Sequence, residues 1–385
     1  MNADVPEPGR AMRTIGAVCV ATMVLLRPSV AVEPCIPDAS PSDGIEDSIA
    51  IQACLNKGGL VSLSPGQHPG YLIERGLKMG SNTTLTSTGA KATLAAHSTL
   101  GAEPILDVLG SNWHISEVAF DGRKYERDAL GLCWSGDRRG YNLKVDGSDF
   151  SITHVDTVNA MCGTALEVVG TNFEIAFVFS AYNGREVGEW PNAPYQWSDG
   201  MTVVYCENGD IHDSTFIDNT DFDLLFGGGP NCSVHHNDIY HQIRFAFAGL
   251  NVGNMDAGKW DGHGSKWRGN HHGSNFFQNR VSSSPGMLMY GLSVGSHPFT
   301  ADTETYAVHN AGGFTQNTST GAQVNLIVDG VLNGEIYGNT LENPQGHRAE
   351  YNSCRISTNY ISGHAGFASR SAAVAMTMDN GVCQP

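Results

Sequence analysis

The chain has 385 residues, of which 46 are glycine, and only 16% are charged. Its 39 acidic residues outnumber its 22 Lys and Arg residues, which gives a net charge of −17. So acidic a surface repels nucleic acid, and no stretch reaches the roughly 18 apolar residues that a membrane span needs. We therefore expect neither nucleic acid nor a membrane as a partner, and the many glycines favour a tightly turned β structure.

Residues 1–31 are predicted to be a secretory signal peptide. Arg10 and Arg13 precede an apolar run from Ile15 to Leu26, and Ser29-Val30-Ala31 provides small residues for cleavage. Residues 32–385 would then form a single secreted domain, extracellular or periplasmic.

Residues 41–56 (PSDGIEDSIAIQACLN) are predicted to form a short amphipathic helix that begins at Ser42 or Asp43. Its predicted apolar stripe consists of Ile45, Ile49, Ala53 and Cys54. Gly58-Gly59 would end the helix, and the next residues alternate as in a strand. We expect this helix to cover the open end of the first coil of a solenoid, because uncovered strand edges promote aggregation.

A nine-residue pattern recurs after this helix and predicts the architecture. The repeats begin at Asn112, Asp149, Asn172, Asn208, Asn231, Gly273, Ala311, Asn333 and Ser353. An apolar residue follows three places on: Ile115, Ile152, Ile175, Ile211, Val234, Phe276, Phe314, Ile336 and Ile356. The seventh place often holds Asn: Asn237, Asn279, Asn317, Asn339 and Asn359.

The repeat starts are separated by 20 to 42 residues, which indicates a base period of about 22 residues lengthened by loop insertions. This period is typical of a β-solenoid, and we expect about ten coils between Asn82 and residue 362. The apolar places would face the interior. The recurrent Asn would adopt left-handed backbone at corners and pass amide hydrogen bonds from coil to coil.

Eight cysteines remain after the signal peptide, and their spacing agrees with the coils. Three pairs are separated by 29, 26 and 29 residues, about one coil each: Cys133 with Cys162, Cys206 with Cys232, and Cys354 with Cys383. Cys35 and Cys54 would tie the N-terminal tail to the helix. The sequence therefore predicts disulfides, as in exported proteins.

Two long insertions, residues 181–198 and 250–272, carry the aromatic residues expected of a carbohydrate cleft. Sugar rings stack their C–H faces on aromatic planes. The predicted substrate-binding residues are Trp190, Trp197, Trp260 and Trp267. The alternative is that these side chains only attach the loops to the coils.

An acidic row lies between the insertions. Asp199 stands nine residues before one repeat start, and Asp221 and Asp223 stand ten and eight before the next. These places are nearly equivalent on coils that stack about 4.8 Å apart, and His241 and Arg244 would extend the row by a coil. Carboxylates this close repel, so one should hold a proton and act as a general acid. Asp213 and Asp218, by contrast, are expected to cap turns.

The opening DSIAIQACLNKGGLVSLSPG…SNTTLTS resembles the start of the pectin-lyase-like right-handed parallel β-helix superfamily, and the resemblance extends over almost the whole mature chain. It implies an all-β, right-handed parallel β-helix. The order of Asp199 in SDG, Asp221 in TDFD and His241 is similar to that of polygalacturonases. Thr220 replaces the first Asp of their Asp pair, and the only GHG, at 262–264, falls in an insertion, so a relative that acts on another glycan fits better.

Three functions follow from these residues. The favoured one is a secreted glycoside hydrolase that needs no cofactor or metal, with Asp221 as acid, Asp199 as base, and Asp223 able to exchange roles. The second is a lyase or C5-epimerase of uronate chains, in which Asp199, Asp221 and Asp223 bind Ca²⁺ and His241 or Arg244 abstracts the proton. The third is a surface β-helix that binds glycan without catalysis.

Overall fold

The computed structural model describes residues 33–66, 69–127, 133, 140–185, 197–254, 269–295, 308, 310–329, 331, 334–342, 361–362, 377–379 and 382–384. The predicted signal peptide lies outside these residues. In the described part of the chain, no helix is long and apolar enough to span a membrane.

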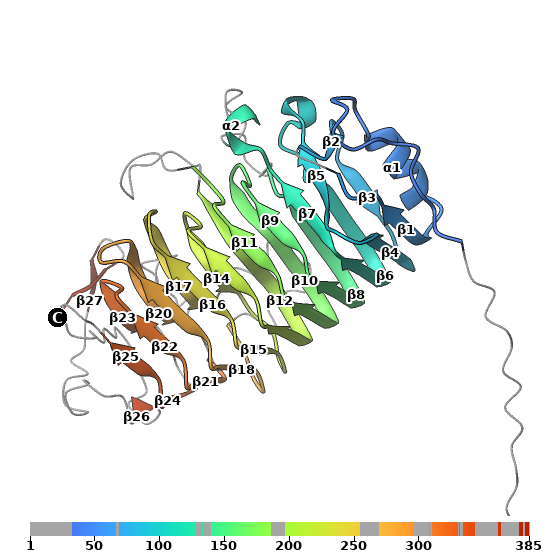
Figure 1. Cartoon of the computed structure of the whole chain (residues 1–385). Coiled ribbons are helices and arrows are strands. Elements are labelled where there is room, and N and C mark those ends of the chain that lie inside the picture. Colours follow the sequence, from blue (N-terminus) through green and yellow to red (C-terminus); the bar gives the residue numbers. More distant parts are fainter. Residues whose placement is uncertain are drawn as a thin grey trace, which may run out of the picture. The chain divides into compact units, whose positions relative to one another are not determined.

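The chain winds into a right-handed parallel β-helix whose strands lie on three faces (Figure 1). Face 1 comprises β1 (Gly59–Leu63), β4 (Thr83–Ser87), β6 (Leu106–Ser116), β8 (Leu143–Thr153), β10 (Gly163–Ala176), β12 (Ser198–His212), β15 (Ser233–His235), β18 (Asn275–Phe277), β21 (Gly313–Thr315), β24 (Glu335–Tyr337) and β26 (Ile361–Ser362).

Among the described residues, face 2 comprises ten strands, in line with the expected number of about ten coils: β2 (Tyr71–Ile73), β5 (Ala92–Ala96), β7 (Val118–Asp121), β9 (Asp156–Val158), β11 (Phe179–Ala181), β13 (Thr215–Ile217), β16 (Asp238–His241), β19 (Arg280–Ser283), β22 (Thr318–Thr320) and β25 (Thr340–Glu342).

Face 3 begins with β3 (Leu77–Met79) and continues in the first halves of β6, β8, β10 and β12, which turn the corner into face 1. It ends with β14 (Phe222–Phe226), β17 (Ala246–Val252), β20 (Leu288–Gly295) and β23 (Val324–Asp329). The remaining elements are helices α1 (Ser48–Leu55) and α2 (Lys124–Arg127), the 3-10 turn η1 (Ser98–Leu100), and an antiparallel pair, β27 (Thr377–Asp379) and β28 (Val382–Gln384).

The apolar place of the repeat builds the interior, as predicted. Ile115, Ile152 and Ile175 are paired across successive strands of face 1, and each is fully buried. The stack continues without a break through Ile211, Val234, Phe276, Phe314 and Ile336. In the last coil, Ile336 pairs with Ile361 and not with the predicted Ile356, so the repeat assigned at Ser353 was out of register.

The seventh-place Asn residues form a buried amide ladder, as predicted. Asn237 donates to Asn279, Asn279 to Asn317, and Asn317 to Asn339, at 2.9 to 3.0 Å between the amide nitrogen and oxygen. The expectation that these Asn adopt left-handed backbone was wrong. The residue before them does so instead, as at His236 (φ 54°), and so do repeat starts such as Asn112 (φ 56°).

Helix α1 packs on the first coil, but it begins at Ser48 and not at Ser42 or Asp43. Its core residues are Ile51, Cys54 and Leu55, whereas Ile45 and Ile49 are exposed. The predicted apolar stripe was therefore wrong, because the helix was expected to begin at Ser42 or Asp43 and in fact begins at Ser48.

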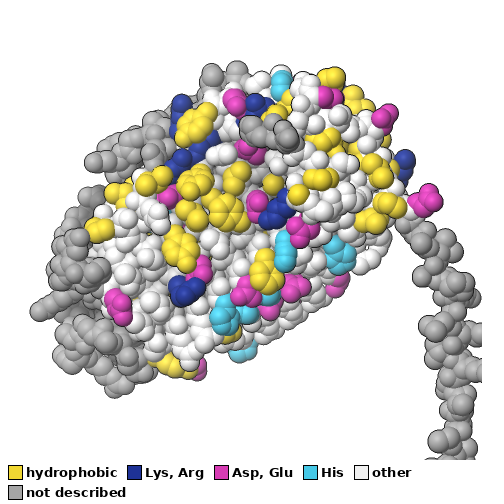
Figure 2. All heavy atoms as spheres, viewed as in Figure 1, with side chains coloured by type: hydrophobic (Ala, Val, Ile, Leu, Met, Phe, Trp, Pro, Cys, Tyr) yellow, Lys and Arg dark blue, Asp and Glu magenta, His cyan; other side chains and the backbone are white. Residues whose placement is uncertain are grey.

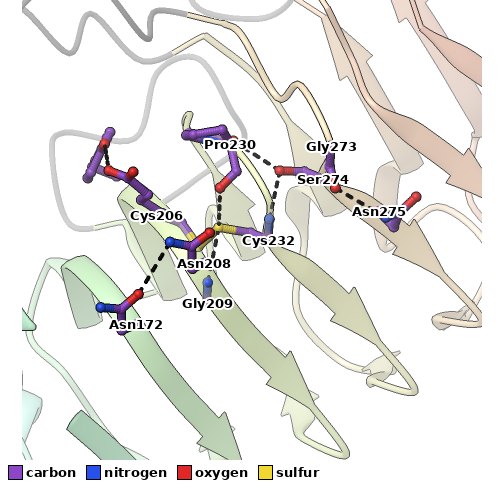
Figure 3. The surroundings of a disulfide bond; sticks show 12 residues. Asn172, Cys206, Asn208, Gly209, Pro230, Cys232, Gly273, Ser274 and Asn275 are labelled. Atoms are coloured by element: carbon purple, nitrogen blue, oxygen red, sulfur yellow. Dashed lines mark hydrogen bonds between the residues drawn. A yellow bond between two sulfur atoms is a disulfide. The ribbon is translucent and has the colours of Figure 1, made fainter. Parts of the chain in front are cut away.

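Three predicted disulfides are confirmed: Cys35–Cys54, Cys133–Cys162 and Cys206–Cys232. Figure 3 shows how Cys206 and Cys232 join adjacent coils where β12 turns into face 1. Beside them, Asn208 donates to the Asn172 side chain of the preceding coil at 3.3 Å. The proposed bridge between Cys354 and Cys383 lies outside the residues whose side chains are described.

Candidate active site

Asp199 and Asp221 lie side by side where face 3 begins. Pairing of Met201 with Leu224 sets β12 against β14, and the Phe222 amide donates to the Asp199 carboxylate at 3.2 Å. The Thr202 hydroxyl donates to the other carboxylate oxygen of Asp199. Thr202 faces outward, since its neighbours Met201 and Val203 are in the interior core. The Asp199 carboxylate is therefore on the outer side of face 3, although only 7% of the residue is exposed.

The charge of Asp199 acts on the neighbouring carboxyl group of Asp221. Asp221 is partly exposed, and burial of its carboxyl together with the charge of Asp199 raises its pKa well above the usual range. Asp199 instead accepts two hydrogen bonds, which stabilise the ionised form of a carboxylate. Asp221 is thus suited to hold a proton, and Asp199 is suited to remain ionised.

Asp223 and His241 do not extend this outer row. Both are fully buried inside the β-helix, with the Asp223 carboxylate 2.5 Å from His241 Nε2 and 2.8 Å from the Asn219 amide nitrogen. Burial lowers the pKa of His241, but the charge and hydrogen bond of Asp223, the hydrogen bond to the Arg244 carbonyl and the charge of Asp218 together outweigh burial, so the pKa lies above the ordinary value. The row prediction failed here because His241 ends β16 on face 2, with its ring in the interior.

A local irregularity on face 3 explains why Asp223 turns inward. Met201, Leu224, Leu250 and Leu292 are paired in register and all lie in the core, and the residues before them are Gly200, Asp223, Gly249 and Gly291. A Cβ atom at Gly200 would lie 2.7 Å from the Asn219 amide nitrogen, so this place also faces the interior. Asp223 thus occupies an interior place where three coils have glycine, and it is accommodated by its contacts to Asn219 and His241.

Asp218 caps a turn, as expected. Its carboxylate accepts the backbone amides of Gln242, Ile243 and Arg244 at 2.8 to 3.3 Å. Asp213 is exposed and contacts His212 at 2.7 Å, away from face 3.

Arg244 lies at the corner between faces 2 and 3, where a second cation joins it. Arg244 and Lys124 both donate to the carbonyl oxygens of Tyr182 and Gly184. The guanidinium of Arg244 also lies 5.6 Å from the ring centre of Tyr182 and donates to the Tyr125 hydroxyl at 3.4 Å. Figure 2 shows Lys and Arg side chains beside hydrophobic ones in this upper part of the molecule, near α2.

This corner presents two aromatic rings to solvent. Tyr125 is 62% exposed and Tyr182 is 39% exposed. Cations border both rings, since Lys124 and Arg185 lie 5.2 and 5.9 Å from the ring centre of Tyr125. Exposed aromatic planes beside hydrogen-bond donors are suited to holding sugar rings.

Of the predicted substrate-binding tryptophans, only Trp197 is among the described residues. It is partly exposed and directly precedes β12, and its carbonyl accepts the Gly163 amide at 2.8 Å. Trp190, Trp260 and Trp267 lie outside the described residues.

Sequence reasoning missed Thr202, Thr220 and the Lys124–Tyr125 pair. A hydroxyl three residues after a candidate acid was a usable signal for Thr202. Nothing in the local sequence pointed to Lys124 and Tyr125, because the winding of the chain brings them to a corner formed about 60 residues later.

The calcium site of the lyase hypothesis does not fit the described side chains. Asp199 faces outward and Asp223 inward, so the three carboxylates do not converge. Among all described residues, no group of three His, Cys, Asp or Glu side chains is arranged to hold a metal ion.

Comparison with known proteins gives the fold a broader context. No protein-family model matches the chain, and no curated protein matches it. Among solved structures, the A-module of mannuronan C-5 epimerase AlgE6 from Azotobacter vinelandii is similar, with a TM-score of 0.56 and 15% identity over 86% of each chain.

Two further solved structures align over most of this chain. The polygalacturonase of Erwinia carotovora has a TM-score of 0.49 and 13% identity over 83% of each chain. The Dettilon tailspike protein has a TM-score of 0.48 and 12% identity, and this chain covers 66% of its length. The chain thus shares its right-handed parallel β-helix fold with the A-module of AlgE6.

Proposed function

We propose that this protein is a secreted glycoside hydrolase that cleaves a polysaccharide with Asp221 as general acid and Asp199 as general base. The observation that carries the proposal is the hydrogen bond from the Phe222 amide to the Asp199 carboxylate, which sets Asp221 directly beside Asp199. Hydrolysis of a glycosidic bond needs such a pair, because one group protonates the leaving oxygen while the other activates water or attacks carbon.

The assignment of roles follows from the surroundings of each group. The raised pKa of Asp221 keeps it protonated at higher pH than an ordinary Asp, as a general acid requires. Asp199 is held by Thr202 and the Phe222 amide, which fixes its orientation and favours its charge. The exposed rings of Tyr125 and Tyr182, together with Trp197, would hold neighbouring sugars of the chain.

The lyase and epimerase hypothesis has less support. His241, one of its two candidate bases, is fully buried, and the carboxylates proposed for Ca²⁺ point to opposite sides of the sheet. Three disulfides agree with an oxidising compartment, so we keep export as part of the proposal.

The test is product analysis with a panel of polysaccharides, with and without EDTA. We expect new reducing ends, no unsaturated product and no loss on chelation. Asp199→Asn and Asp221→Asn should each lower turnover by about 10²–10⁴-fold, the usual contribution of general acid–base catalysis, with little change in melting temperature. For wild type, activity should fall as the pH rises through the raised pKa of Asp221, because the acid then loses its proton.

Asp213→Asn is the matched control, because this exposed carboxylate lies outside the pair and should leave turnover unchanged. An unsaturated product that requires metal would select the lyase. Binding without any cleavage would select the non-catalytic protein.

A further inference from the structure

Thr220 connects the two segments that carry Asp199 and Asp221. It directly precedes Asp221, and its hydroxyl accepts the amide of Ser198, the residue before Asp199, at 3.1 Å. The same hydroxyl donates to the Asn183 carbonyl at 3.1 Å, and the Thr220 amide donates to that carbonyl at 3.2 Å. Because Thr220 is only 7% exposed, solvent competes little for these bonds.

The Asn183 carbonyl is itself a firmly held anchor. Asn183 is fully buried, and its amide nitrogen donates to the side chains of Asn219 at 2.7 Å and Ser180 at 3.0 Å. Its amide oxygen accepts the Ala160 amide at 2.8 Å.

The flanks of this anchor are fixed as well. The carbonyls of Tyr182 and Gly184, on either side of Asn183, accept hydrogen bonds from Lys124 and Arg244. Thr220 is therefore attached to a rigid part of the corner and transmits that rigidity to both acidic strands.

We propose that Thr220 is a positioning residue that sets the separation of the Asp199 and Asp221 carboxyl groups, an inference that rests on the proposed hydrolase function. The Thr220 hydroxyl bonds to the backbone of Ser198 and Asn183, so it acts on the acidic pair through the backbone. This hydroxyl holds the start of β12 against the segment before β14, so that the two carboxyl groups keep a fixed separation. A misplacement of about 1 Å in an active site can cost about 10²-fold in rate.

The test compares Thr220→Val, which keeps the shape but loses the hydroxyl, with Thr220→Ser, which keeps the hydroxyl. For Thr220→Val we expect kcat to fall by about 10²-fold with KM little changed. The alkaline limb of the pH–rate profile should move to lower pH, since carboxyl groups that relax apart raise one another's pKa less. Thr220→Ser should retain kcat within about 3-fold and the wild-type profile, because the hydroxyl bonds persist.

Thr83→Val is the control for the structural cost of a buried hydroxyl. Thr83 is 1% exposed, its hydroxyl donates to the Ser81 carbonyl at 3.3 Å, and β6, β8 and β10 separate its strand β4 from β12, so its loss should lower the melting temperature without moving the pH profile. Wild-type kcat and pH profile in Thr220→Val would overturn the proposal, as would an unshifted profile with reduced kcat.

If Thr220→Val does not fold, Thr220→Cys keeps the size and a weaker donor. It should then show an intermediate loss of kcat and a smaller shift of the same limb, and a wild-type profile would again overturn the role of Thr220. Failure of the hydrolase function itself would be recognised separately, because wild type would then release no new reducing ends, or Asp221→Asn would retain full activity.

Discussion

At the scale of single residues, burial separates the acidic side chains into different roles. Asp199 lies on the outer side of face 3 beside the partly exposed Asp221, whereas Asp223 is enclosed with His241 and Asn219. Residues two positions apart thus have different environments, one suited to proton transfer and the other to an internal ion pair.

The buried pair predicts a pH-dependent contribution of His241 to stability. Burial lowers the pKa of His241, but the pKa is raised in the folded protein because the charge and hydrogen bond of Asp223, with smaller contributions from Arg244 and Asp218, together outweigh burial. Its stabilisation is therefore complete below the unfolded value of about 6.5 and is lost as the pH rises through the raised folded value. The other charged group facing His241 is Asp218, 3.7 Å away.

His241→Gln should lower the free energy of unfolding by about 3–5 kcal/mol below this window, because Asp223 is left as a buried, unpaired charge. The loss relative to wild type should shrink at alkaline pH, where wild-type His241 is neutral too. Urea denaturation at several pH values measures both. In an Asp223→Asn background the pH dependence of the His241 effect should flatten, and a loss that is equal at all pH values would contradict the assignment.

At the scale of elements, the Asn ladder ties the later coils together. Besides its bonds to the neighbouring Asn side chains, the side chain of Asn279 donates to the Val234 carbonyl and accepts a hydrogen bond from the backbone amide of Asn237. Each buried group that loses its partner costs about 1–3 kcal/mol.

Asn279→Ala should therefore destabilise the protein by several such contributions, about 3–5 kcal/mol in total. Chemical denaturation measures the loss. Asn275→Ala, an exposed position on the same coil, is the control and should change stability by less than about 0.5 kcal/mol. Equal effects of the two substitutions would show that the ladder contributes no more than a surface amide.

At the scale of the whole molecule, disulfides join neighbouring coils at separate levels of the β-helix. Cys206 and Cys232 are fully buried and close a loop with a sequence separation of 26 residues. Closure of a loop of this size restricts the unfolded chain by about 3–4 kcal/mol.

The double substitution Cys206→Ala with Cys232→Ala should lower the free energy of unfolding by about that amount and leave the fold intact. Denaturation of the oxidised variant and wild type measures the difference. Non-reducing peptide mapping is the accompanying check, and it should also join Cys354 to Cys383. A fragment linking Cys206 to a cysteine other than Cys232 would contradict the coil register.

The repeat made the fold predictable because an interior place must be apolar in every coil. Ile115, Ile152 and Ile175 show this periodicity directly, and the Cys206–Cys232 spacing follows from it. The helix stripe was misassigned at Ile45 because the helix has no neighbouring repeat, and the last repeat was misassigned at Ile356 because it has a neighbouring repeat on one side only.

The sequence by itself determined the solenoid, its disulfide spacing and the proximity of Asp199 to Asp221, since all three depend only on counting residues per coil. Only the tertiary structure decided which side of the sheet each acidic residue occupies. The irregularity before Leu224 turns Asp223 inward, and the position of His241 at the end of face 2 turns its ring toward it. Lys124 and Arg244 both donate to the Gly184 carbonyl because the corners of successive coils lie on top of one another. No local sequence pattern predicts this arrangement.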